Sequence, residues 1–412
     1  MKSLVFLFIL ILCSACTAPG VPIIEPSSTP AFTSSPIETI TPAALDPSPT
    51  PIETTTPTIS IPSPTPDFNI LVNNLAIDQQ GQIYASGFSE GNDQRHYAQW
   101  TGEYWIEMGN GFQTAGNTLI ADGEGYIYTD ILVDTENGMA TAIIKWDGSK
   151  WEDITGNFIS MVDGLRAGRV SSNIPVTAMA VDGADNLFVA GMFYYSTADY
   201  AYEIPMGYLA KWDRQTWTVL GEGLDLINVY GLAVSSDGNV YVSGEQPASP
   251  EGNNCYIAHW EGREWMQVNT GDLNWCSQSL VVDKSGHLYA AGQSNTTGVL
   301  IAYWDNSDWS TIADQLEGEA PAVYDMAVDQ DGRLCIGGEF TSVNNVPAKQ
   351  IACWDGKSWY ALGDGVNERV FALAFDPGGE LYAAGYFSEA GGLPATHAAR
   401  WDGEKWHALG EE

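Results

Sequence analysis

Tryptophan recurs along this chain in pairs with one constant internal spacing, and this repeat constrains the fold more than any other feature. Fourteen of the 15 tryptophans fall in seven W-x4-W pairs: Trp100 and Trp105, Trp146 and Trp151, Trp212 and Trp217, Trp260 and Trp265, Trp304 and Trp309, Trp354 and Trp359, Trp401 and Trp406. Successive pairs are separated by 46, 66, 48, 44, 50 and 47 residues. A period of about 40 to 50 residues is typical of a four-stranded propeller blade, and it excludes the shorter solenoid repeats.

Each repeat predicts four β-strands. The first is an apolar segment that ends in Asp, such as LAID at residues 75–78, and a Gly-centred turn leads to a second strand such as QIYASG. The third strand runs to the first Trp, and a turn such as WDGSKW leads to a fourth strand that begins at the second Trp. Four residues in this turn place the two Trp opposite each other, so their indoles should be in contact.

No segment shows a sustained helical period of apolar residues, so we expect an all-β domain. Seven four-stranded units bury their faces only by stacking radially, which predicts a seven-bladed β-propeller over residues 68–412. Because the repeats begin at a first strand and end after a fourth, we expect whole blades, with no strand exchanged between the ends.

The order of these elements resembles the kelch repeat, with LCIGG at residues 334–338 and WDGKSW at residues 354–359 as examples. It is also similar to the WDGxxW propeller repeats of secreted and cell-surface proteins. The resemblance covers residues 70–410 and implies the fold, not an activity. Kelch-type propellers include the galactose oxidase domain, but no matching copper-ligand set of Tyr, His and Cys is visible, so that chemistry is not carried over.

The N-terminus has the pattern of an export signal. Residues 1–12 read MKSLVFLFILIL, one Lys followed by an apolar stretch too short to span a membrane. Cys13-Ser14-Ala15-Cys16 then resembles a bacterial lipobox, which implies a signal peptide over residues 1–16 and lipidation of Cys16. The sequence departs from that pattern at Cys13, where Leu is usual. The alternative is an ordinarily cleaved, secreted protein.

A polar segment follows the signal. Residues 17–67 hold 13 of the 21 prolines and 18 Ser or Thr, with no Lys or Arg. Such a chain cannot bury a core, so we expect a disordered, semi-stiff Pro/Ser/Thr-rich linker that holds the propeller away from the membrane.

The formal charge of −36, from 16 Lys+Arg and 52 Asp+Glu, makes nucleic acid and anionic lipid improbable partners. We expect membrane contact only through the lipid anchor, and a monomer.

Loop lengths predict where a ligand binds. The first-to-second and third-to-fourth strand turns share one face of the wheel, here called the short-turn face. The second-to-third connections and the blade-to-blade loops share the other, the long-loop face, and they carry the length variation. One insertion there holds five tyrosines that either stack on sugars or a protein partner, or fold the insertion onto its blade: Tyr194, Tyr195, Tyr200, Tyr202 and Tyr208.

Acidic residues recur at the end of the first strand: Asp78, Asp122, Asp182, Asp283, Asp329 and Asp376, with Ser235 in the seventh repeat. Such an Asp usually accepts N–H groups of the turn that it begins. The alternative is a ring that takes a cation such as calcium. We otherwise expect no cofactor.

Four cysteines lie in the predicted propeller, and an exported protein permits disulfides. Cys335 and Cys353 are on neighbouring strands of one blade, and Cys255 with Cys276 would link two blades. No spacing typical of a metal site is present.

These observations favour a surface-anchored, non-catalytic propeller that binds a protein or polysaccharide through its long-loop face. The alternatives are a carbohydrate-active hydrolase or lyase with carboxylates near the channel, and a purely structural envelope protein.

Overall fold

The computed structural model describes residues 70–89, 95–109, 116, 118–135, 138–156, 176–196, 203–221, 224, 226, 228–246, 255–268, 275–294 and 298–410. The chain divides into two units, Met1–Ser60 and Ile61–Glu412, and every described residue belongs to the second. In these ranges no helix is long and apolar enough to span a membrane.

The described part of the second unit contains seven antiparallel four-stranded sheets, each with its strands in the order of the chain. Blade 1 consists of β1 (Ile70–Ile77), β2 (Ile83–Ser89), β3 (Arg95–Trp100) and β4 (Trp105–Glu107). Blade 2 consists of β5 (Leu119–Ala121), β6 (Ile127–Thr135), β7 (Gly138–Trp146) and β8 (Trp151–Asp153). Blade 3 consists of β9 (Val176–Val181), β10 (Leu187–Ser196), β11 (Glu203–Trp212) and β12 (Trp217–Val219). Blades 4 and 5 consist of β13 (Asn228–Val234), β14 (Val240–Glu245), β15 (Cys255–Trp260) and β16 (Trp265–Gln267); and β17 (Trp275–Val282), β18 (Leu288–Ser294), β19 (Gly298–Trp304) and β20 (Trp309–Ala313). Blades 6 and 7 consist of β22 (Ala322–Val328), β23 (Leu334–Glu339), β26 (Ile351–Trp354) and β27 (Trp359–Ala361); and β28 (Val370–Phe375), β29 (Leu381–Gly385), β32 (Ala398–Trp401) and β33 (Trp406–Ala408).

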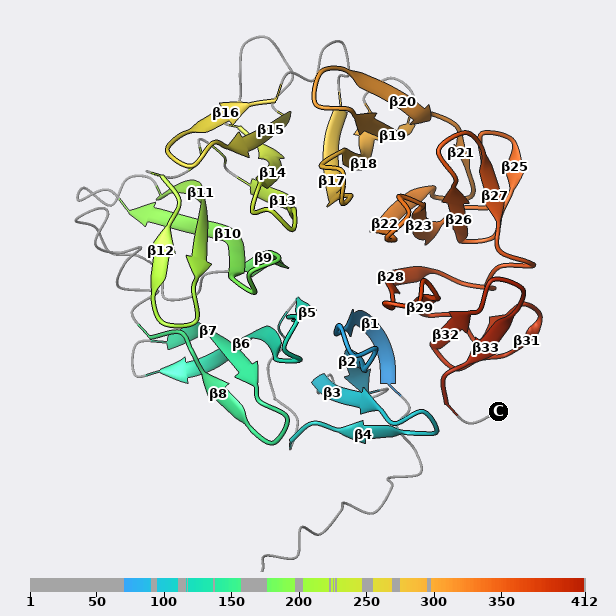
Figure 1. The fold of residues 1–412 in the computed structure, drawn as a ribbon, viewed down its shortest axis with the longest axis horizontal. Coiled ribbons are helices and arrows are strands. Elements are labelled where there is room, and N and C mark those ends of the chain that lie inside the picture. The colour runs from blue at the N-terminus through green and yellow to red at the C-terminus, as the bar shows by residue number, and fades with distance from the viewer. Residues whose placement is uncertain are drawn as a thin grey trace, which may run out of the picture. The chain divides into compact units, whose positions relative to one another are not determined.

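The blades are arranged around a central axis, with their first strands innermost (Figure 1). Each first strand packs against the first strand of the next blade, and β28 of blade 7 packs against β1 of blade 1, which closes the wheel. Blades 1 and 7 are each one contiguous stretch of chain, so no strand is exchanged where they meet. The all-β, seven-bladed fold expected from the sequence is confirmed.

Two further small sheets lie in blades 6 and 7. The connection from β23 to β26 forms the hairpin of β24 (Ser342–Val343) and β25 (Val346–Pro347), which pairs with β21 (Leu316–Glu317). The connection from β29 to β32 forms the hairpin of β30 (Glu389–Ala390) and β31 (Leu393–Pro394). Both turns hold two consecutive residues with positive φ, Asn344-Asn345 and Gly391-Gly392, as a tight two-residue hairpin requires.

The paired tryptophans face each other across the hairpin of the third and fourth strands in every blade, as predicted. Their ring centroids lie between 5.1 Å, for Trp260 and Trp265, and 6.2 Å, for Trp304 and Trp309. In six blades the indole Nε1–H of the second Trp also donates to a carbonyl of the preceding blade. The pairs are Trp105 with Leu409, Trp151 with Met108, Trp217 with Ile154, Trp265 with Leu220, Trp359 with Ile312 and Trp406 with Leu362, at 2.8–3.1 Å. The second Trp therefore joins blades, and Trp105 joins blade 1 to blade 7.

The first strand carries a β-bulge at one repeat position in six blades. The extra residue is Asn73, Thr177, Tyr230, Gln278, Tyr324 or Phe371. A bulge turns the strand and re-aims the side chain of the extra residue.

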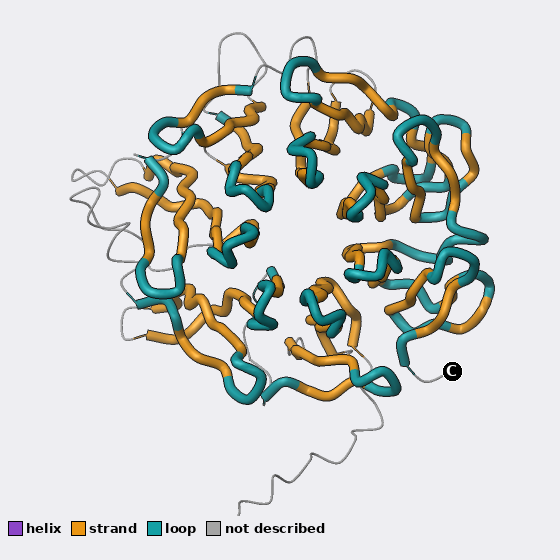
Figure 2. Tube along the Cα trace, in the orientation of Figure 1, coloured by secondary structure: helices purple, strands orange, loops and turns teal. Residues whose placement is uncertain are grey.

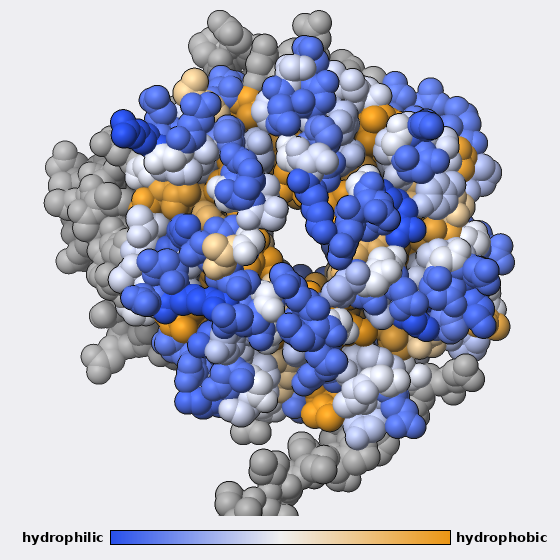
Figure 3. All heavy atoms as spheres, viewed as in Figure 1, coloured by the Kyte–Doolittle hydropathy of each residue, from blue (hydrophilic) through white to orange (hydrophobic). Residues whose placement is uncertain are grey.

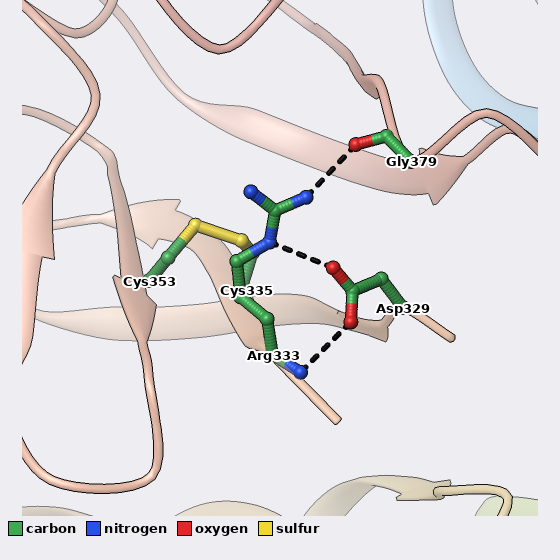
Figure 4. The surroundings of a disulfide bond; sticks show 5 residues. All are labelled: Asp329, Arg333, Cys335, Cys353 and Gly379. Carbon is green, nitrogen blue, oxygen red and sulfur yellow. Dashed lines mark hydrogen bonds and ion pairs between the residues drawn. A yellow bond between two sulfur atoms is a disulfide. The ribbon is translucent and has the colours of Figure 1, made fainter. Parts of the chain in front are cut away.

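A disulfide joins Cys335 of β23 to Cys353 of β26, which face each other in the blade 6 hairpin (Figure 4). Both cysteines are fully buried. Cys255 is also disulfide-bonded, while the side chain of Cys276, the partner expected for it, lies outside the described ones. Next to the first disulfide, Arg333 donates to Asp329 of its own turn and to the Gly379 carbonyl of blade 7 at 2.8 Å.

Candidate functional site

The central channel has two mouths of different chemistry. The first-to-second strand turns surround the opening in Figure 2, and Figure 3 shows that this short-turn face is mostly hydrophilic and hollowed at its centre. A cavity of about 360 Å³ lies at this mouth. A second cavity, of about 300 Å³, is lined by residues early in the first strands. Because each first strand runs toward the short-turn face, this second cavity lies toward the long-loop face.

The repeated Asp residues of the short-turn mouth hold their own turns together. The Oδ1 atom of Asp122 accepts the backbone N–H groups of Glu124 and Tyr126, at 3.0 and 2.9 Å. In five further blades the Oδ1 atom of the corresponding Asp likewise accepts backbone N–H groups of its turn: Asp78, Asp182, Asp283, Asp329 and Asp376. In the remaining blade the Ser235 hydroxyl accepts the N–H of Asn239. This is the turn role that the sequence favoured.

The second oxygen of these carboxylates is also engaged in several blades. Asp122 Oδ2 accepts the Tyr128 hydroxyl at 2.9 Å and the Arg214 guanidinium at 2.8 Å. Burial and this carboxylate raise the pKa of Tyr128, so its hydroxyl remains a donor. Among the residues that the structure describes, no group of three or more His, Cys, Asp or Glu is placed to hold a metal ion.

The long-loop mouth brings aromatic and polar side chains together. Its cavity is lined by the bulge residues Tyr230, Gln278, Tyr324 and Phe371, together with Thr118 and Asp325. Repetition of the bulge explains this convergence, because each blade presents the same extra residue near the same end of its first strand.

Three aromatic rings of blades 6 and 7 form one cluster beside this cavity, here called the aromatic ledge: Tyr324, Phe371 and Tyr386. The Tyr324 and Phe371 rings lie 5.3 Å apart across the boundary between the blades, and those of Phe371 and Tyr386 lie 4.7 Å apart, edge to face. Tyr324 is 41% exposed and Tyr386 is 43% exposed. The two tyrosines therefore expose large aromatic surfaces close together on the long-loop face.

An ion pair borders the ledge. Arg369 of blade 7 donates through Nε to Glu339 Oε2 of blade 6 at 2.6 Å, and the Tyr324 hydroxyl donates to the same oxygen at 3.3 Å. Burial and the Glu339 carboxylate raise the pKa of Tyr324, so this hydroxyl stays protonated. Blade 4 repeats part of the arrangement, since the Tyr230 hydroxyl donates to Glu245 Oε2 at 2.8 Å.

Asp325 is the one carboxyl among the described residues that line this cavity. Its Oδ1 accepts the N–H of Met326 at 2.8 Å, and its Oδ2 accepts the N–H of Leu373 in blade 7 at 2.7 Å. Burial raises the pKa of Asp325 to about 7, against the effect of the two N–H donors. The carboxyl therefore has both oxygens engaged, Oδ1 within its own strand and Oδ2 in a link between blades 6 and 7.

The tyrosine-rich insertion is described only in part. Tyr194 and Tyr195 lie in β10 opposite Pro205 and Ile204, and Tyr208 lies in β11 opposite Gly191. Tyr200 and Tyr202 lie outside the described residues. A binding role for these five residues stays a prediction.

Loop length alone does not reveal the aromatic ledge, although the sequence holds another signal for it. Tyr324, Tyr230 and Phe371 share one column of the repeat, and the residues 15 positions later are Glu339, Glu245 and Tyr386. Other blades carry Asn, Thr or Gln in the first column. A repeat position that is aromatic in some blades and polar in others indicates a surface that differs from blade to blade.

Comparison with known proteins supports the fold and goes no further. No family profile matches the chain, and no curated protein matches it. Among solved structures, the uncomplexed acylaminoacyl peptidase of Pyrococcus horikoshii is 10% identical with a TM-score of 0.53, covering 84% of this chain and 53% of that one. The chain thus spans about half the length of that enzyme.

Two further structures match at lower TM-scores. A streptogramin B lyase is 11% identical with a TM-score of 0.48, covering 77% of this chain and 91% of that one. The β-propeller domain of the trilobed protease from Pyrococcus furiosus is 9% identical with a TM-score of 0.37, covering 70% and 94%. At such identities the likeness concerns the fold alone.

Proposed function

We propose that this chain is an exported, lipid-anchored, kelch-like β-propeller of the WDGxxW-repeat kind that binds a protein or polysaccharide at the cell surface through its long-loop face, without catalysing a reaction. In this proposal the signal peptide ends at Cys16, whose lipid anchors the protein, and residues 17–67 form the linker. The protein acts as a monomer.

The observation that carries the binding role is the aromatic ledge beside the cavity of the long-loop mouth. Two exposed tyrosines, a partly buried Phe371 and an ion pair meet there on rigid strands of two blades. Rigid aromatic side chains with polar neighbours give a ligand large contact areas at a low cost in conformational entropy.

A carbohydrate-active hydrolase or lyase is the second candidate, and Asp325 is the observation in its favour. A carboxyl with a pKa of about 7 in a channel cavity has the properties of a general acid. However, glycoside hydrolysis ordinarily needs two carboxyl groups facing the bond, and Asp325 is the one carboxyl among the described residues lining this cavity. Both of its oxygens also accept backbone N–H groups, which supports a structural role.

The test combines binding with turnover. The purified full-length chain is screened against envelope polysaccharides and envelope proteins, and each bound polysaccharide is incubated for product release. We expect saturable binding without products. Product release that Asp325→Asn abolishes while binding is retained would establish the enzyme instead.

The lipid anchor has its own test. Cells expressing the chain are labelled with a fatty acid, and Cys16→Ser is compared with the wild type. We expect label and membrane association only with Cys16 present. A chain that is released and unlabelled in both cases would contradict the anchor.

A further inference from the structure

We infer that the ligand of the long-loop face is a neutral polysaccharide whose sugar rings stack on the aromatic ledge of Tyr324, Phe371 and Tyr386. The inference rests on the proposed function, because it names the ligand class for the same face. The shape of the ledge, its local charge and its size all favour such a ligand.

The shape of the aromatic ledge suits a ligand whose rings are apolar on one face and polar at the edge. Phe371 lies between the two tyrosines, and Tyr386 meets it edge to face, so the ledge is corrugated rather than flat. The polar groups of Glu339 and Arg369 border it on the side of Tyr324. A sugar places C–H groups on one face of its ring and hydroxyls around the edge. Aromatic rings flanked by a carboxylate and a guanidinium match that pattern, because the hydroxyls then have both acceptors and donors.

The local charge favours a neutral polymer. The whole chain carries −36, so a polyanionic polysaccharide would be repelled. A cationic peptide needs an unpaired carboxylate, and the acid at the ledge, Glu339, already binds Arg369 through Nε and through a second nitrogen at 3.3 Å. The Glu339 carboxylate of the ledge is therefore paired with Arg369, and the exposed Glu368 next to Arg369 adds a negative charge that further disfavours a polyanion.

The size of the ledge favours a polysaccharide over a protein as the ligand. A stable protein interface buries about 800 Å² on each partner around an apolar core. Among the described residues, five large hydrophobic side chains are exposed: Tyr104, Met266, Tyr324, Tyr386 and Leu393. Only Tyr324 and Tyr386 belong to the ledge. Among the described residues, the ledge thus offers two or three rings, which suit a short run of sugar units.

The experiment measures binding of the full-length chain to soluble polysaccharides by calorimetry and affinity electrophoresis. The neutral probes are galactomannan, xyloglucan, mixed-linkage β-glucan, mannan and dextran, and alginate serves as the anionic probe. The variants are Tyr324→Ala, Tyr386→Ala and Tyr324→Phe. Tyr104→Ala is the matched control, since it removes a tyrosine of similar exposure, 38%, from a third-to-fourth strand turn on the opposite face. Thermal unfolding verifies that each variant is folded.

We expect at least one neutral probe to bind, and each Tyr→Ala change on the ledge to weaken that binding about tenfold. Tyr324→Phe should retain most of the affinity because it keeps the ring, and Tyr104→Ala should leave it unchanged.

Three results would overturn the inference while leaving the proposed function standing. These are a neutral polysaccharide that binds equally well to both ledge variants, binding of alginate alone, and binding of an envelope protein alone. If the wild type binds none of the polysaccharides and no envelope protein, the proposed function itself fails.

Discussion

At the scale of single residues, the glycine that closes the second strand is explained by the bulge beside it. A Cβ added to Gly385 would lie 2.0 Å from the carbonyl oxygen of Arg369, the residue just before the first strand β28. Gly87, Gly244 and Gly338 show the same approach in three other blades, at 2.0–2.2 Å. The glycine is therefore needed for a close contact between backbones, not for a turn.

We expect Gly385→Ala to reduce the free energy of unfolding by about 1 to 3 kcal/mol, because the first strand must move to make room for the methyl group. Urea unfolding measures the change. Gly403→Ala is the control, since its φ of 99° adds strain but no atom lies within 4 Å of its added Cβ. Equal losses at both positions would contradict the contact.

Asp325 gives a prediction about pH. Its pKa is raised from 3.8 in the unfolded chain to about 7 in the folded protein, so the folded state holds the proton more tightly. The stability that it contributes is present below about pH 4 and is lost as the pH rises toward 7. One pKa unit corresponds to about 1.4 kcal/mol, so a few kcal/mol are at stake.

The measurement compares the wild type with Asp325→Asn by urea unfolding between pH 4 and pH 8. The difference in stability between the two should shift in favour of the variant as the pH rises, and level off above pH 7. A difference that stays constant over this range would show that the carboxyl is not protonated in the folded protein.

At the scale of the elements, the second tryptophan of six pairs does more than pack against the first, because it also donates to the preceding blade. Trp406 Nε1 donates to the Leu362 carbonyl of blade 6 at 2.8 Å, in a buried position. Phenylalanine would keep an aromatic ring but leave that carbonyl without a donor. We expect Trp406→Phe to reduce the free energy of unfolding by about 1 to 3 kcal/mol.

Trp401→Phe tests whether the hydrogen bond causes this loss. It replaces the other indole of the same pair with a smaller ring, and the structure gives no such hydrogen bond for Trp401. Denaturant unfolding of the two variants should show the larger loss for Trp406→Phe. If Trp401→Phe costs as much, the contribution comes from ring packing and not from the hydrogen bond.

Features that repeat within one blade were predictable, and features that depend on several blades were less so. The pairing of Trp401 with Trp406 follows from four residues in a turn, and the role of Asp122 follows from the turn that it begins. The hydrogen bond of Trp406 to another blade was not expected, since it requires knowing which strand ends meet. The ledge was missed for a related reason: the bulge turns Tyr324 toward Phe371, which is 47 positions away in the sequence.

At the scale of the whole molecule, closure depends on the contact between blades 1 and 7. Leu409 is buried there with Ile70 and Val72 of β1, and its carbonyl accepts the Trp105 indole at 3.1 Å. Leu362 has the corresponding position between blades 6 and 7.

We expect Leu409→Ala to reduce the free energy of unfolding by about 2 to 5 kcal/mol, because it leaves a cavity between blades 1 and 7. Hydrogen exchange should then rise first in β1, β2, β32 and β33, because these strands form the boundary where the wheel closes. Leu362→Ala should cost a similar amount without raising exchange in β1 and β2. Equal exchange profiles for the two variants would show that closure is no weaker than any other boundary between blades.

Because every blade is one uninterrupted stretch of chain, the position of the ends is not dictated by hydrogen-bonded pairing of strands. Joining residue 410 to residue 70 by a short linker, and opening the chain between blades 3 and 4, would leave each four-stranded sheet intact. Such a circularly permuted protein should fold to the same wheel with the tyrosines of the ledge in place. The surface of the long-loop face depends on the order of the blades around the axis and not on the order in which they are synthesised.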